Sequence, residues 1–392
     1  MGQGAKRPSM GFWGRASAAA LIAGLALACV AGTDAMYNGR SFFRQGAPTL
    51  FDAYFIGRMV VSAVLGGALV VAIYRARDAS SVMATGAWGG AGGAPAALAS
   101  VILAAGLGVT LLLDPATFSW LAREDSLAET ASAFLLLGGC ATLLWAASVL
   151  WRNGKGRRAG IVPAILLAGL LFLIGMEELS WMQRLLDVKT PEWLKEINDQ
   201  QETNFHNTAT FAAEVSYYLG GFVVLALVPF VMDAAPRTRL SLRYAAFDAG
   251  RFVVVAGAMT TMFSAKFWDI QLAQVAFFGS IAGLVVYALL LARARRFGEV
   301  ALFVFAALVL VVIGPATLIS HPTMVRGWDD TEIKEFLLAF GLAFYAIQTS
   351  RRLALQDVAG ASGQSDAVSA GNAPATGRSA HQEQKAEGMV AA

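Results

Sequence analysis

Apolar segments of helical length recur along the whole chain, separated by short polar connections. A helix needs about 20 apolar residues to cross the hydrocarbon core of a bilayer, and most of these segments approach that length. The sequence therefore predicts an all-α fold, a polytopic transmembrane helix bundle of about ten spans. The predicted spans cover residues 16–32, 54–73, 95–113, 127–151, 161–182, 211–232, 251–267, 270–292, 299–319 and 333–350.

The connections between these segments form two alternating populations. Every second connection is rich in Lys and Arg, and those between them are rich in acids, amides and tryptophans. Because cytoplasmic loops carry the excess of Lys and Arg, this alternation predicts that both termini are cytoplasmic. The basic residues are Lys6, Arg7, Arg15, Arg75, Arg77, Arg152, Lys155, Arg157, Arg158, Arg237, Arg239, Arg243, Arg293, Arg295, Arg296, Arg351 and Arg352.

The composition agrees with a membrane protein. Of the 392 residues 57% are hydrophobic and only 15% are charged, whereas soluble proteins have roughly 25% charged residues. No basic patch interleaved with aromatics indicates a nucleic-acid partner. Membrane lipid is the partner that the composition supports, and the sequence identifies no protein partner.

The chain divides into a bundle and a tail. We expect residues 1–353 to form the transmembrane helix bundle, with a large outward polar connection at 183–210. From Ala354 the sequence turns to Ala, Gly, Ser, Gln and Glu without periodicity, which is typical of disorder. We therefore expect residues 354–392 to form a disordered cytoplasmic tail.

The densest polar cluster of the predicted bundle lies between the fifth and sixth spans. Glu177, Ser180, Arg184 and Asp187 would share one face if the fifth helix continued past the membrane. A glutamate inside a span costs at least about 2 to 3 kcal/mol, so it needs a partner, a cavity or a metal. Alternatively, Glu177 and Glu178 lie at the headgroup level, solvated or paired with Arg184. Glu178, which points about a quarter turn away, fits that simpler interpretation better.

The start of the sixth span gives a second group. If its helix begins near Glu202, then Glu202, His206, Thr210 and Glu214 follow one another on one face. A Glu and a His one turn apart can share a metal ion, or act as a base and its orienting partner. Taken alone, His206 fits a capping histidine better. Glu214 lies several residues inside an apolar span, where its desolvation demands a partner.

Other helix entries on the outward side carry paired acids. We interpret Asp125, Ser126, Asp330 and Thr331 as helix caps, because acids and hydroxyls satisfy free amide groups at helix N-termini. Capping does not explain two acids that lie a turn deeper, which are better candidates for a site. These are Glu129 and Glu335.

Two further outward features have structural interpretations. Thr190 and Pro191 resemble a helix start, and the apolar residues that follow predict an amphipathic helix on the membrane surface. Lys266 and Asp269 are expected to form a hairpin ion pair between the seventh and eighth spans, which contributes little to stability.

The candidates combine into one outward-facing site. As catalytic residues we predict Glu129, Glu177, His206 and Glu214. As possible metal ligands we predict Glu177, Glu202, His206 and His321. The sequence specifies no cofactor beyond a possible divalent metal.

The motifs E-E-L-S-W-M-Q-R at 177–184, P-E-W-L-K-E-I-N at 191–198 and E-T-N-F-H-N at 202–207 resemble those of a group of uncharacterised bacterial multipass membrane proteins. The resemblance covers about residues 120–215 and implies a multipass protein without implying an activity. With the basic connections inside, it implies a bacterial cytoplasmic (inner) membrane protein whose polar site faces the periplasm or exterior.

Three functions follow from the sequence. The leading hypothesis is a membrane-embedded hydrolase or transferase acting on a lipid or lipid-linked substrate, because carboxylates and imidazoles gather on one side of the membrane. The alternative is a proton- or cation-coupled transporter that uses the intramembrane glutamates. A third interpretation is an envelope assembly scaffold, in which the same residues form an interface.

Overall fold

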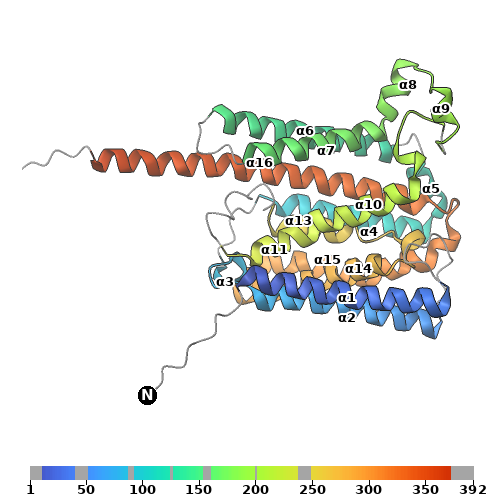
Figure 1. The fold of residues 1–392 in the computed structure, drawn as a ribbon, viewed down its shortest axis with the longest axis horizontal. Helices are drawn as coiled ribbons and strands as arrows, with labels where there is room; N and C mark the ends of the chain where they lie inside the picture. The colour runs from blue at the N-terminus through green and yellow to red at the C-terminus, as the bar shows by residue number, and fades with distance from the viewer. Residues whose placement is uncertain are drawn as a thin grey trace, which may run out of the picture.

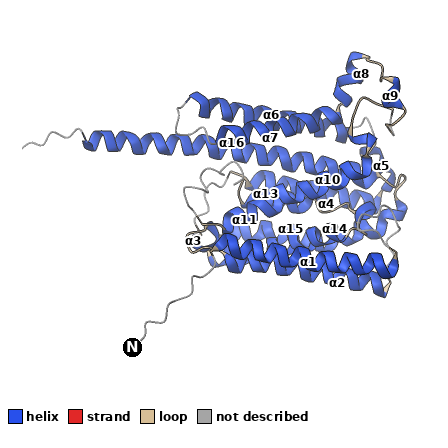
Figure 2. Cartoon of the chain, in the orientation of Figure 1, coloured by secondary structure: helices blue, strands red, loops and turns tan. Residues whose placement is uncertain are grey.

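The computed structural model describes residues 11–39, 52–86, 92–123, 127–152, 160–198, 201–236 and 249–371, and within them the side chains of 184, 185 and 354–371 are not described. In these ranges the regular structure is helical and no strand is present (Figure 2). The all-α prediction is therefore confirmed. The predicted capping residues Asp125 and Ser126 lie outside the described residues.

Eight segments are long and apolar enough to cross a membrane, which confirms a multipass architecture. They are α1 (Phe12–Asn38), α2 (Ala53–Ala76), α4 (Ala94–Leu113), α6 (Leu127–Arg152), α7 (Ile161–Glu178), Thr210–Ala234, α14 (Gln271–Arg293) and Phe297–Thr323. Thr210–Ala234 consists of α10 (Thr210–Phe222), a π-helical turn (Val223–Leu227) and α11 (Val228–Ala234). Phe297–Thr323 consists of α15 (Phe297–Ser320) and a 3-10 turn (His321–Thr323).

Two of the ten predicted spans are not confirmed as membrane-spanning helices. The predicted span 251–267 contains α13 (Arg251–Met259), which is only 9 residues long. At 1.5 Å per residue it covers about 14 Å, roughly half of the hydrocarbon core. The chain continues through turns to a short 3-10 helix (Ala265–Phe267). Every residue of α13 is buried, so this segment is an internal element of the bundle.

The other exception is α16 (Asp329–Gly371), a helix of 43 residues. It lies between the α6 and α7 pair and the rest of the bundle (Figure 1). The helix continues to Gly371, past Ala354, where the sequence predicts a disordered tail. Its first turns are too polar for an ordinary apolar span, because they contain Asp329, Asp330, Glu332, Lys334 and Glu335.

Neighbouring helices form a continuous series across the bundle. α1 and α2 lie at one edge and α2 packs on α14, which contacts α15, and α15 in turn contacts α4. At the other edge α7 packs on α6, and α6 packs on α16 (Figure 1). α13 contacts both α4 and α16, so it joins the two halves.

The two ends of the bundle differ in their connections (Figure 1). One end, which we call the basic end, carries Arg75, Arg77, Arg152, Arg293, Arg295, Arg296, Arg351 and Arg352. The opposite end, the polar end, contains residues 114–123, 179–198, 201–209, 260–270 and 321–328. α1 begins and α16 leaves the bundle at the basic end. The sequence prediction that this end is cytoplasmic stays a prediction.

The connection after α7 is compact and irregular. Ser180, Trp181 and Met182 have φ angles of 45°, 56° and 62°, a region that residues other than glycine rarely adopt. Single helical turns follow as α8 (Gln183–Leu186) and α9 (Glu192–Lys195). The predicted surface helix is therefore only one turn long.

The predicted cap of that surface helix is also wrong. The Thr190 hydroxyl accepts a hydrogen bond from Gln183 Nε2 at 2.5 Å, and α9 has no side-chain cap. Trp193 is exposed, as expected for a membrane-surface residue, whereas Leu194 is buried. The apolar side predicted for this helix is thus divided between an exposed and a buried residue.

Candidate functional site

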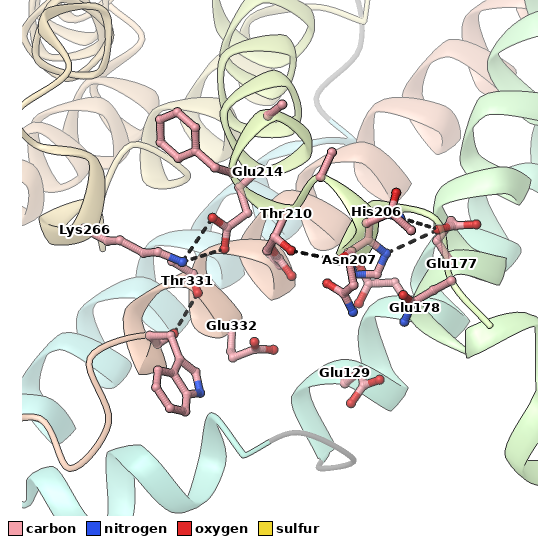
Figure 3. Close-up of a pocket in the computed structure, with 17 residues that line it drawn as sticks. Glu129, Glu177, Glu178, His206, Asn207, Thr210, Glu214, Lys266, Thr331 and Glu332 are labelled. Carbon is pink, nitrogen blue, oxygen red and sulfur yellow. Dashed lines mark hydrogen bonds and ion pairs between the residues drawn. The ribbon is translucent and has the colours of Figure 1, made fainter. Parts of the chain in front are cut away.

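A cavity of about 730 Å³ opens at the polar end, and we call it the polar chamber (Figure 3). Its walls come from α6, α7, the connection before α10, α10 itself, the 3-10 helix Ala265–Phe267 and α16. The charged residues of the described lining are Glu129, Glu177, Glu178, His206, Glu214, Lys266, Glu332 and Glu335. The chamber therefore brings together all four residues that the sequence predicts as catalytic.

A second cavity of about 370 Å³ continues from the chamber, and we call it the apolar groove. Its apolar lining comes from α7, α10, the π-helical turn and α16. Leu170 of α7 and Ser216 and Gly220 of α10 line the groove and are exposed on the bundle surface. The groove thus opens sideways between α7 and α10. Five residues line both cavities: Glu177, Glu178, His206, Glu214 and Glu335.

Glu177 holds the connection that carries His206. Its Oε2 atom accepts hydrogen bonds from the backbone N–H groups of Phe205 at 2.6 Å and His206 at 3.0 Å. The indole Nε1 of Trp181 donates to Oε1 at 2.5 Å. His206 Nδ1 lies 3.4 Å from Oε2 (Figure 3). These contacts make Glu177 a positioning residue for the imidazole.

The neighbours of His206 in the chamber change the pKa of its ring. Burial alone would lower the pKa of its ring, but the hydrogen bond and charge of Glu177 and the nearby carboxylates of Glu335 and Glu129 raise it. The net effect is a pKa above the ordinary value of 6.5. A protonated imidazole beside a cavity can act as a general acid.

Lys266 and Glu214 form an ion pair across the chamber (Figure 3). Lys266 Nζ lies 3.0 Å from Oε1 and 3.1 Å from Oε2 of Glu214. Glu214 is buried, so the pair supplies the partner that its position inside an apolar segment demands. The predicted Lys266 and Asp269 pair is wrong, because Asp269 faces Arg58, with Oδ1 3.7 Å from Nη1.

The four predicted metal ligands do not form a cluster. Glu177 and His206 contact each other, but Glu202 accepts hydrogen bonds from Ser180 and Asn204 instead. His321 begins the 3-10 turn after α15 and does not line the chamber. Within the described ranges no group of three or more His, Cys, Asp and Glu side chains is arranged to hold a metal ion.

The two predicted polar helix faces do not form, because α7 ends and α10 begins at residues other than those predicted. α7 ends at Glu178, so Ser180 and Asp187 do not continue the face of Glu177. The Arg184 side chain lies outside the description. α10 begins at Thr210, and Glu202 lies in a turn where its N–H donates to the Asn198 side chain at 3.2 Å. Glu202 therefore belongs to the framework of the connection.

Glu178 lines both cavities, although the sequence favours a headgroup position for it. Glu177 and Glu178 both line the chamber from the end of α7, although they are adjacent in the helix (Figure 3). Glu335 also lines both cavities and accepts a hydrogen bond from the Tyr218 hydroxyl at 3.0 Å. The position of Glu335 one turn inside the start of a predicted helix is the feature that identifies it in the sequence.

Comparisons with models of protein families, with curated proteins and with solved structures found no match. The function is therefore inferred from the geometry of the two cavities.

Proposed function

We propose that this protein is a membrane-embedded hydrolase or transferase that acts on a lipid or lipid-linked substrate. The observation that supports this proposal is the meeting of the polar chamber and the apolar groove at the same ionisable residues. An amphiphile can place its head group among acids and bases while its chain lies in the groove. A water-soluble substrate would have no use for an apolar groove that opens sideways.

The chamber residues have complementary roles in this proposal. His206 is the general acid, and Glu177 holds it in place through the contacts of its two carboxylate oxygens. Glu178 and Glu335 are the general bases at the junction of the two cavities. General acid and base catalysis of this kind contributes about 10² to 10⁴ in rate. Glu129, together with the ion pair of Glu214 and Lys266, sets the electrostatic potential around the head group.

The lining of the groove favours an enzyme over a carrier. A proton- or cation-coupled carrier needs polar positions that continue through the membrane. Along α10 toward the basic end, however, the groove is lined by Gly220, Gly221 and Val224, with Leu342 of α16. The ionisable residues of the two cavities are thus concentrated toward one end of the bundle.

The proposed location is the bacterial inner membrane, with the chamber facing the periplasm or exterior. The support is the placement of arginines at the opposite, basic end of the bundle. Cytoplasmic connections normally carry this excess of basic residues. The chamber would then receive head groups from the outer leaflet.

The test uses the full-length protein in liposomes made from a bacterial lipid extract, with mass spectrometry of the lipids over time. We expect the wild-type protein to consume at least one lipid species. Substitution His206→Gln should slow this by about 10² to 10⁴, whereas Glu192→Gln, on an exposed side chain outside both cavities, should not. An unchanged lipid composition with wild-type protein would overturn the proposal.

A further inference from the structure

We propose that a third cavity, at the basic end of the bundle, binds the head group of an anionic phospholipid. This cavity, which we call the basic cavity, has a volume of about 980 Å³ and lies between the beginnings of α4 and α15. Its described lining shares no residue with the polar chamber or the apolar groove. The inference therefore goes beyond the proposed function and does not depend on the chemistry of the chamber.

The basic cavity is open to the surface of the bundle along an apolar edge. Leu98 of α4 and Phe297 and Phe305 of α15 line it and are exposed, whereas Phe252 and Leu302 line it and are buried. Both α4 and α15 belong to segments that are long and apolar enough to cross a membrane. The acyl chains of a lipid beside these helices can therefore contact the exposed apolar residues.

The charged groups around the basic cavity have an excess of positive charge. Glu299 is the carboxylate of the described lining, and guanidinium groups engage both of its oxygens. Its Oε2 atom accepts a hydrogen bond from Arg251 Nε at 2.8 Å, and its Oε1 atom pairs with Arg296 Nη2. With Arg295, which also lines the cavity, three guanidinium groups stand against one carboxylate. The cavity therefore attracts an anion.

Arg295 supplies the cation that a ligand can reach. Its side chain is exposed at the cavity, and among the described residues no carboxylate pairs with it. A guanidinium group presents a planar set of N–H donors that matches the oxygens of a phosphate. Basic pockets between transmembrane helices recognise anionic lipid head groups in this way.

The backbone at Arg295 is a second, independent observation. The N–H of Arg295 donates to the Ala292 carbonyl at 3.0 Å and that of Arg296 to the Leu291 carbonyl at 2.9 Å, which is the Schellman ending of α14. Arg295 has a φ of 56° at the position of this motif where glycine is normally favoured. The chain thus has an arginine at a position where its own backbone would favour glycine.

The apolar edge favours a phospholipid over a soluble phosphate ester. A soluble ester could contact Arg295 and Arg296 but would leave the exposed Leu98, Phe297 and Phe305 without a partner of their own kind. A phospholipid contacts both groups, because its phosphate and its acyl chains are joined. The occupant is therefore a membrane lipid with a net negative charge.

The test offers dioleoyl phosphatidylglycerol and dioleoyl phosphatidylcholine at equal concentration to the purified full chain in detergent, and native mass spectrometry measures the lipid that stays bound. These lipids share their acyl chains and phosphate and differ in net charge. We expect phosphatidylglycerol to bind at least about tenfold more tightly, because each excess arginine favours an anionic lipid by about fivefold. Equal binding of the two lipids would overturn the proposal.

Two variants locate the binding. Arg295→Gly removes the cation and suits the backbone, so it should fold normally by thermal unfolding and lower the preference for phosphatidylglycerol by about fivefold. Arg295→Asn, which also tolerates this conformation, should do the same. Arg293→Gln is the matched control, because Arg293 is exposed in the same turn but does not line the cavity; it should keep the wild-type preference.

Equal losses in the Arg295 and Arg293 variants would show that the whole basic end attracts anions, and would overturn a site in the cavity. Glycerol 3-phosphate, added in large excess, should not displace the bound phosphatidylglycerol, because it has no acyl chains for the apolar edge. Displacement by glycerol 3-phosphate would overturn the lipid as the occupant.

Discussion

Adjacent glutamates at the end of α7 have different environments. Both oxygens of Glu177 are occupied, by the Trp181 indole and by the backbone and ring of His206 with its neighbour Phe205. Glu178 instead faces both cavities. A change at Glu177 should therefore act through the imidazole, whereas a change at Glu178 should act on the ligand.

The His206 pKa gives a test at the scale of one residue. Because Glu177 and the nearby carboxylates raise the pKa of His206 in the folded protein, we expect a value above 6.5. The stabilisation from the Glu177 contact is then complete below pH 6.5 and is lost as the pH rises through the folded-state pKa. NMR titration of a variant with His321→Gln and His381→Gln, which leaves His206 as the sole histidine, measures this pKa.

Glu177→Gln in the same background should lower the His206 pKa, because it removes the charge that stabilises the imidazolium. The matched substitution Glu192→Gln, outside both cavities, should leave it unchanged. A His206 pKa at or below 6.5 in the parent protein would contradict the expected effect of the chamber carboxylates on the imidazole.

At the scale of elements, the interruption after α13 places a cation in the chamber. α13 ends at Met259, and hydroxyls of Thr260 and Thr261 bond to carbonyls three residues earlier at 2.7 Å. Phe263 then adopts a φ of 51°. The chain reverses through the Ala265–Phe267 turn, from which Lys266 reaches Glu214. A continuous helix through this region would not have this turn at the chamber wall.

The close packing of α2 on α14 gives a prediction about stability at the scale of helices. A Cβ atom added at Gly66 would lie 2.7 Å from the Val275 carbonyl oxygen and 2.8 Å from the Gly279 nitrogen, whereas at Gly67 nothing lies within 4 Å. Gly66→Ala should destabilise the protein by about 1 to 3 kcal/mol through overpacking. Gly67→Ala should be neutral or stabilising by up to about 1 kcal/mol, because alanine favours helix.

The free energy of unfolding of both variants in the same detergent measures this difference. Each substitution adds one methyl group to neighbouring positions of one helix, so each serves as the control for the other. Equal stability of the two variants would contradict the close approach of α2 and α14.

At the scale of the whole molecule, hydropathy along the sequence predicts the class of fold correctly. It does not predict the arrangement of the helices inside the bundle. Apolar runs predict the multipass helical bundle, because the bilayer requires long apolar helices. The predicted span 251–267 has a similarly apolar average composition, yet its helix is interrupted. Thr260, Thr261 and Ser264 are buried and satisfy their hydroxyls locally, an effect that an averaged hydropathy does not register.

The candidate site was predicted in part for a related reason. Glu129, Glu177, His206 and Glu214 share the chamber, because an acid inside or beside a span needs a polar cavity or a partner. Glu202 was misplaced because its position was derived from a helix that begins eight residues later, at Thr210. Spacing along a sequence indicates a shared face only where the helix is continuous. The catalytic roles of these residues stay predictions.

Membrane sidedness can be tested with cysteine labelling. In a protein with Cys29 and Cys140 replaced by alanine, Thr208→Cys at the polar end and Ser80→Cys near the basic end provide two exposed reporters. If the basic end is cytoplasmic, a membrane-impermeant maleimide added to intact bacteria should label Thr208→Cys alone. Ser80→Cys should react only after the inner membrane is opened. The reverse pattern would contradict the proposed orientation.

The sideways opening between α7 and α10 also determines how the site fills. Leu170, Ser216 and Gly220 are exposed where the groove reaches the bundle surface. In the proposed function, a lipid substrate would therefore enter by lateral diffusion within the bilayer. Its effective concentration is then its mole fraction among the membrane lipids. Diluting the liposomes in buffer should leave the turnover rate unchanged, whereas diluting the substrate with inert lipid should lower it.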